Sequence, residues 1–97
     1  MRLEAEEVFR DLFMEMYIMI QILRLPAAMA LNGLSRSSTY NHIAQGLWPK
    51  PVAIGARAVG FPAAECEAVI AARIAGKSDD EIRALVARLV SARKTVT

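Results

Sequence analysis

The chain has 97 residues, which is enough for one domain with a modest core, and 55% of them are hydrophobic, too many for a disordered chain. A single cysteine, Cys66, excludes an internal disulfide framework, and with one histidine, His42, we expect neither a metal site nor a cofactor. No apolar run approaches the roughly 20 residues of a membrane-spanning helix, and the acidic first residues are unlike a secretory signal, so we expect a cytoplasmic protein. No acid–base pair, activated nucleophile or phosphate-binding loop is present, so we expect no enzyme.

The net charge of +2 is unevenly distributed. No carboxylate occurs in the 49 residues between Glu15 and Glu65, and this stretch has a net charge of +4. A carboxylate-free basic zone is typical of a surface that meets a polyanion, although buried, Ala-rich sequence produces similar gaps. Its cations are Arg24, Arg36, Lys50 and Arg57.

Residues 1–21 are interpreted as an amphipathic helical extension. Apolar residues recur at helical spacing over residues 3–23, although residues 17–23 are also rich enough in β-branched and aromatic residues for a strand. Such a helix either covers the core or joins copies of the chain, and Met16 and Met19 are alternative starts. The stripe is Phe9, Leu12, Met16, Met19 and Leu23.

A helix-turn-helix is predicted next. Pro26 suits the first turn of a helix that stops near Asn32-Gly33, a pair that tolerates positive φ. Ser35 is a good N-cap for a second helix, Arg36 to Gln45, which ends at Gly46. Two short helices joined by a tight turn that contains glycine are typical of this motif.

The second helix has two different faces. At 100° per residue Thr39, Tyr40, Ile43 and Leu47 cluster on the side predicted to face the core. The opposite face offers Ser37, Ser38, Asn41 and Gln45. Amides suit adenine edges, hydroxyls suit bases or phosphates, and Arg36 in the first turn can reach phosphate or guanine. His42 lies at the boundary of the two faces, where a packed or phosphate-touching role is favoured over base reading.

A β-hairpin is predicted to follow the second helix. Val52 and Ile54 alternate with small residues, as do Val59 and Phe61, and a turn with Gly55 and Arg57 separates the two runs. Arg57 at such a tip can enter a minor groove or contact phosphate, and the alternative is a solvated turn residue.

Two further helices are predicted after the hairpin. The first runs from Pro62 to Gly76, and Ser78 with Glu81 forms a capping box for the second, within residues 77–97. The second helix has an apolar stripe that faces either the core or a partner. Its late basic residues, Arg93 and Lys94, are expected to complement the helix dipole, and contact with the DNA backbone is the less favoured role. Trp48 and Cys66 are predicted to pack in the core or at a hinge. The stripe is Ile82, Leu85, Val86, Leu89 and Val90.

Four short motifs in this order resemble the AlpA family of phage-type regulators over residues 22–75. They are Ile22-Leu23-Arg24-Leu25-Pro26, Gly33 to Tyr40, Gly46 to Val52 and Gly55 to Phe61. The resemblance implies a small MerR-type winged helix-turn-helix that activates integrase or excision genes or acts as an excisionase. It carries DNA contact over to Arg36, Ser37, Ser38, Tyr40 and Asn41, and the wing to Lys50 and Arg57. The chain departs from the family pattern at Ala27, Thr39 and Phe61.

We therefore expect a mainly α fold, with a winged helix-turn-helix domain over residues 22–76, additional terminal helices and binding of double-stranded DNA. The leading hypothesis is an excisionase, or recombination directionality factor, that binds cooperatively near an attachment site, bends DNA and directs a tyrosine integrase towards excision. The alternative is a transcriptional regulator of integrase or mobile-element genes, and a protein-interaction module is less favoured. Self-association is expected because one small module buries too little surface for tight specific binding.

Overall fold

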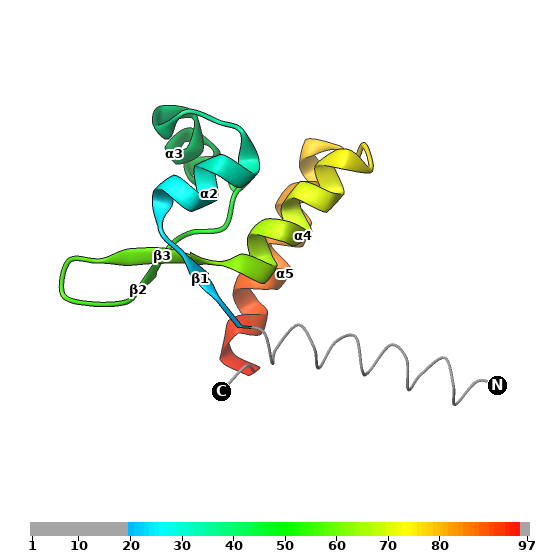
Figure 1. The fold of residues 1–97 in the computed structure, drawn as a ribbon. Coiled ribbons are helices and arrows are strands. Elements are labelled where there is room, and N and C mark those ends of the chain that lie inside the picture. Colours follow the sequence, from blue (N-terminus) through cyan, green and yellow to red (C-terminus); the bar gives the residue numbers. More distant parts are fainter. Residues whose placement is uncertain (1–19, 96–97) are drawn as a thin grey trace.

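The structure, a computed structural model, describes residues 20–95. It is mainly helical with one small antiparallel sheet, which confirms the predicted winged helix-turn-helix fold (Figure 1). The helix predicted over residues 3–23 lies outside the described residues except at its end. The elements are β1 (Ile22–Leu23), α2 (Leu25–Asn32), α3 (Arg36–Ala44), β2 (Val52–Ala53), β3 (Val59–Pro62), α4 (Ala63–Ile74), α5 (Asp79–Ala92) and the 3-10 turn η1 (Arg93–Thr95).

The predicted helix-turn-helix is present as α2 and α3. Pro26 stands in the first turn of α2, and Gly33 ends the helix with a left-handed φ of 70°. The Ser35 side chain caps α3 by accepting a hydrogen bond from the Ser38 backbone N–H at 3.1 Å. The turn signals in the sequence therefore act where they were expected to.

The sheet contains one strand more than the hairpin that the sequence predicts. Its order is β1-β3-β2, with Ile22 opposite Pro62 and Val52 opposite Gly60. Residues 22–23, whose composition fitted either helix or strand, form the strand β1. The hairpin of β2 and β3 projects away from the helices, and the Ile54 N–H donates to the Ala58 carbonyl at 2.9 Å to close it (Figure 1).

At Gly60 the strand β3 packs closely against β1. A Cβ added there would overlap with Ile22 Cγ2 and lie 3.1 Å from the Leu23 carbonyl oxygen. We expect Gly60→Ala to lower the free energy of unfolding by about 1–3 kcal/mol, because the added methyl overpacks this contact. Urea denaturation followed by circular dichroism measures the change.

Ile22→Ala provides the control for that prediction, because it removes the side chain that the new methyl meets. The double variant should recover part of the lost stability, whereas simple additivity of the two single changes would contradict the proposed clash.

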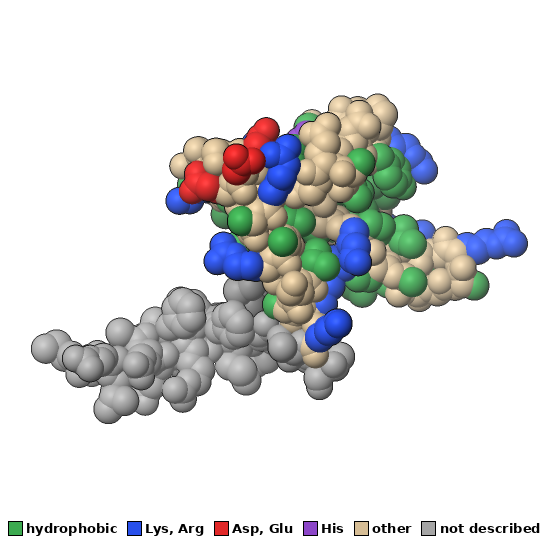
Figure 2. All heavy atoms as spheres, turned by 180° about the vertical axis from the view of Figure 1, so that it is seen from behind, with side chains coloured by type: hydrophobic (Ala, Val, Ile, Leu, Met, Phe, Trp, Pro, Cys, Tyr) green, Lys and Arg blue, Asp and Glu red, His purple; other side chains and the backbone are tan. Residues whose placement is uncertain are grey.

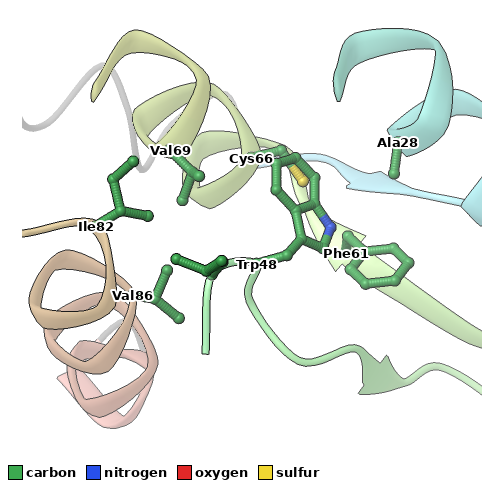
Figure 3. Close-up of a cluster of buried hydrophobic side chains, with 8 residues drawn as sticks. Ala28, Trp48, Phe61, Cys66, Val69, Ile82 and Val86 are labelled. Carbon is green, nitrogen blue, oxygen red and sulfur yellow. The ribbon is translucent and has the colours of Figure 1, made fainter. Parts of the chain in front are cut away.

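One core joins the helix-turn-helix to the two following helices. Trp48 and Phe61 lie at its centre, with Ala28 contributed by α2, and Cys66 and Val69 by α4 (Figure 3). Trp48 and Cys66 are buried, as predicted. Burial raises the pKa of the Cys66 thiol to about 12, so the thiol stays protonated at neutral pH.

Helix α5 contributes to this same core. Ser78 and Glu81 form the predicted capping box at its start, with the Glu81 N–H donating to Ser78 Oγ at 3.2 Å. Ile82 and Val86 are buried, so the apolar stripe of α5 faces the core. Leu85, Leu89 and Val90 are partly buried against the same cluster.

Candidate nucleic-acid interface

The solvent-facing side of α3 carries most of the predicted site residues. Arg36, Ser37, Asn41 and Gln45 are exposed, and Ser38 is half-buried beside the cap. Asn41 lies one turn after Ser37, and Gln45 one turn after Asn41, so a row of hydroxyl and amide groups follows the helix. This exposed face contains no carboxylate. We call these five residues together with Tyr40 the α3 face.

The placement of Tyr40 against the core was wrong. Its side chain is 45% exposed, whereas Thr39 is fully buried and Ile43 half-buried. Within α3 only Thr39 is buried, so Tyr40, at the edge of the apolar stripe, remains in solvent, where water satisfies its phenol hydroxyl. Tyr40 consequently joins the other candidate contacts.

Side-chain hydrogen bonds hold the turn between α2 and α3 in place. The buried Thr39 hydroxyl donates to the Ser35 carbonyl at 2.9 Å and accepts from Asn32 Nδ2 at 3.3 Å. Asn32 Oδ1 also accepts from the Leu34 N–H at 2.8 Å. Thr39 therefore buries its hydroxyl with both partners satisfied, and the two helices are held at a defined angle.

The hairpin carries the remaining candidate residues. Arg57 lies in the exposed tip, residues 55–57, and Lys50 is exposed at the approach to β2. Within the α3 face, Ser37, Asn41 and Gln45 follow one row along the helix, while Lys50 and Arg57 lie separately, at the approach and at the tip of the hairpin. A projecting hairpin with a cation at its tip has the form of a wing.

The acidic residues of α5 are paired and lie apart from the wing. Asp79 pairs with Arg73 at 2.8 Å, Asp80 with Arg83 at 3.1 Å and Glu81 with Lys77 at 3.9 Å. The hydrogen bond from Arg73 lowers the pKa of the Asp79 carboxyl, and hydrogen bonds from Ser78 lower that of Glu81. Figure 2 shows acidic side chains gathered at one end of the molecule, away from the projecting hairpin.

The basic residues of the carboxylate-free stretch, unlike the acidic residues of α5, have no ion-pair partners among the described residues. Within residues 20–95, no ion pair involves Arg24, Arg36, Lys50 or Arg57, and all four are exposed. The surface of α3 and the wing is therefore positive without internal neutralisation, and a polyanion is the partner that such a surface favours.

Three residues near the site have structural roles that the sequence did not predict. Arg93 was expected to complement the dipole of its own helix, but it binds Glu65 through two hydrogen bonds of 2.9 and 2.7 Å. It also donates to the Lys50 carbonyl at 2.7 Å. Arg83 donates to the Gln45 carbonyl at 2.9 Å. The sequence signal for these contacts was Glu65, a carboxylate within a largely apolar helix. It indicated that a cationic partner was needed but did not identify Arg93, 28 residues away.

His42 does not belong to the α3 face. It is half-buried and lines a pocket of about 300 Å³ between the α2–α3 turn and α4. Leu34, Trp48 and Ile70 contribute to the largely apolar wall of this pocket.

Within residues 20–95, no group of His, Cys, Asp and Glu side chains could hold a metal ion. No helix in the same range has the length and apolar character needed to cross a membrane.

A helix-turn-helix followed by a basic hairpin defines a small winged helix-turn-helix protein. The family described as prophage CP4-57 regulatory protein (AlpA) matches residues 21–74, more than half of the chain. The chain belongs to the AlpA family of phage-type regulatory proteins, which confirms the resemblance seen in its motifs.

One relative comes from a phage. The uncharacterized protein ORF88 of Enterobacteria phage P4 is 42% identical over 57 residues, and the match spans 59% of this chain and 65% of the phage protein. The chain thus matches slightly less than two thirds of that protein's length. No solved structure matches the chain.

Proposed function

We propose that this protein binds duplex DNA sequence-specifically, with α3 in the major groove and the wing on the adjacent backbone or minor groove. The carrying observation is the exposed α3 face, which combines a cation, hydroxyls and amides without a carboxylate, next to a wing whose Arg57 has no ion pair among the described residues. Family membership supports a regulatory, DNA-binding role.

The side chains divide into base contacts and backbone contacts. Asn41 and Gln45 suit adenine edges, and Arg36 suits guanine or phosphate. Ser37, Ser38 and Tyr40 donate hydroxyl hydrogen bonds to bases or phosphates, while Lys50 and Arg57 bind the backbone.

Base reading by α3 predicts a loss of discrimination when either Arg36 or Asn41 is replaced by alanine. Each variant should lose about 1–3 kcal/mol for its preferred duplex and much less for a scrambled duplex of equal length. Fluorescence anisotropy titrations at one fixed salt concentration measure both affinities. If both variants distinguish the preferred from the scrambled duplex as well as the wild-type chain does, neither Arg36 nor Asn41 reads bases.

Backbone contact by the wing predicts a different signature for Arg57→Ala. Affinity should fall by a similar factor for preferred and scrambled duplexes, and the slope of log K against log salt should become shallower by about 1. Arg88→Ala, which removes an exposed arginine from α5, is the matched control and should leave the slope unchanged. An unchanged slope in Arg57→Ala would exclude a phosphate contact.

For the biological role, we propose an excisionase that binds cooperatively in several copies, bends DNA and directs a tyrosine integrase towards excision. A single small module supports only limited specific affinity, and cooperative neighbours supply the remainder. Integrase-mediated excision with and without the purified protein tests this role, and unchanged directionality would exclude it.

A transcriptional regulator of integrase or mobile-element genes is the second candidate, because the same DNA-binding face would serve at a promoter. A reporter assay that responds to the protein without integrase would favour this candidate.

Sedimentation of the chain without residues 1–15 tests self-association through the amphipathic extension, and an unchanged mass would exclude it. A protein-interaction module without DNA binding is disfavoured by the unpaired cations of the α3 face and the wing.

A further inference from the structure

The segment that joins the recognition helix to the wing is anchored at both ends by arginines from the C-terminal part of the chain. Arg83 Nε donates to the Gln45 carbonyl at 2.9 Å, where α3 ends. Arg93 Nη2 donates to the Lys50 carbonyl at 2.7 Å, where the approach to the wing begins. We call residues 45–50 the linker.

The interior of the linker is anchored by burial. Leu47 and Trp48 are 4% and 2% exposed, and Pro49 is fully buried. The Leu47 N–H donates to the His42 carbonyl at 2.8 Å, which ties the start of the linker to the last turn of α3. The linker therefore has little freedom once its two ends are held.

Each arginine is itself held by a carboxylate. Asp80 Oδ1 accepts from Arg83 Nη1 at 3.1 Å, and Glu65 binds Arg93 through both of its oxygens. A guanidinium presents its donors in a rigid fork, so fixing one edge on a carboxylate orients the remaining donors towards a carbonyl. Arg83 also places a cation at the C-terminal end of α3, where the helix dipole favours it.

We propose that Arg83 and Arg93 are positioning residues for DNA binding, which set where the wing stands relative to the recognition helix. The inference rests on the proposed DNA-binding function. It assigns the spacing between the major-groove contact and the wing contact to residues outside the family match, which ends at residue 74. A held linker admits one separation of the two contacts along the duplex, whereas a loosened linker admits several.

The test measures tolerance to a change in spacing. The full chain first selects a preferred duplex from a random-sequence pool, and footprinting locates the base pairs protected by α3 and by the wing. A second duplex carries one extra base pair between them, which displaces the contacts by about 3.4 Å and rotates them by about a tenth of a turn. For the wild-type chain we expect this insertion to weaken binding at least tenfold.

The Arg83→Ala variant should reduce that insertion penalty at least threefold. A merely structural loss of folded protein would lower both affinities by one factor and leave their ratio unchanged. Arg88→Ala, with the same loss of charge on the same helix, should keep the wild-type penalty, whereas Arg83→Lys, which keeps the charge but lacks the rigid fork, should resemble Arg83→Ala. A wild-type penalty in Arg83→Ala would overturn the proposal.

Hydrogen exchange without DNA separates this inference from the proposed function. The amides of Gln45, Gly46 and Leu47 close the end of α3 and should exchange at least threefold faster in Arg83→Ala. Those of Ala75 and Gly76, at the end of α4, should be unchanged. Accelerated exchange in a chain that selects no duplex would refute DNA binding while showing that Arg83 holds the linker. Unchanged exchange at residues 45–47 would overturn the positioning role itself.

Discussion

Replacing Arg93 by methionine is expected to lower the free energy of unfolding by about 3–5 kcal/mol, because it leaves the buried Glu65 carboxylate without its partner. The Glu65 side chain is 9% exposed and that of Arg93 19%, so solvent replaces little of the lost interaction. The Lys50 carbonyl loses its donor in the same variant. Urea denaturation monitored by far-UV circular dichroism measures the change.

The double variant Arg93→Met, Glu65→Leu is the control for this prediction. It removes both charges and keeps apolar volume at the site, and replacements of buried ion pairs by apolar residues are often neutral or stabilising. We expect the double variant to recover most of the stability lost in Arg93→Met. A single variant within 0.5 kcal/mol of the wild-type chain, roughly the effect of an ordinary surface change, would contradict the burial argument.

Replacing Ile82 by alanine is expected to cost about 2–5 kcal/mol, the usual range for a large-to-small change in a core. Ile82 is fully buried on α5 and belongs to the cluster that includes Trp48 and Val69. Thermal and urea unfolding of the Ile82→Ala variant measure this loss of stability. A chain that stops after Gly76 lacks α5 altogether, and we expect it not to fold. The stability of a small domain is only about 5–15 kcal/mol, so the loss of a whole core helix exceeds it.

Ile74→Ala serves as the matched control, because Ile74 is 82% exposed on α4 and its truncation should change stability by less than about 0.5 kcal/mol. Cooperative unfolding and a dispersed NMR spectrum for the chain that stops after Gly76 would show instead that α5 is an accessory helix.

The sequence was most informative where the structural signal is local. Gly33 and Ser35 predicted the turn of the helix-turn-helix, and both act as a terminator and a cap in the structure. Ser78 and Glu81 likewise predicted the start of α5. The exposure of Ser37, Asn41 and Gln45 followed from helical periodicity, since an apolar face on a nine-residue helix turns the opposite face towards solvent.

The features that the sequence did not reveal depend on contacts between distant residues. Strand β1 is only two residues long, and its pairing with β3 is a tertiary contact that composition cannot specify. The bonds from Arg93 to Glu65 and from Arg83 to Gln45 join residues 28 and 38 positions apart. Tyr40 was misplaced because periodicity gives the direction of a side chain and not the depth of the core below it.

The pairing of β1 with β3 also has a kinetic consequence. Ile22 meets Pro62 only after the chain between them, which contains the whole helix-turn-helix and the wing, has closed into a loop of about 40 residues. Helices α4 and α5, by contrast, are neighbours along the chain, joined through Gly76 and a capping box. Because local contacts form before distant ones in small domains, we expect the α4–α5 hairpin to belong to the folding nucleus and β1 to dock late. Substitutions in β1 should then mainly accelerate unfolding, whereas those in the α4–α5 contact should slow folding.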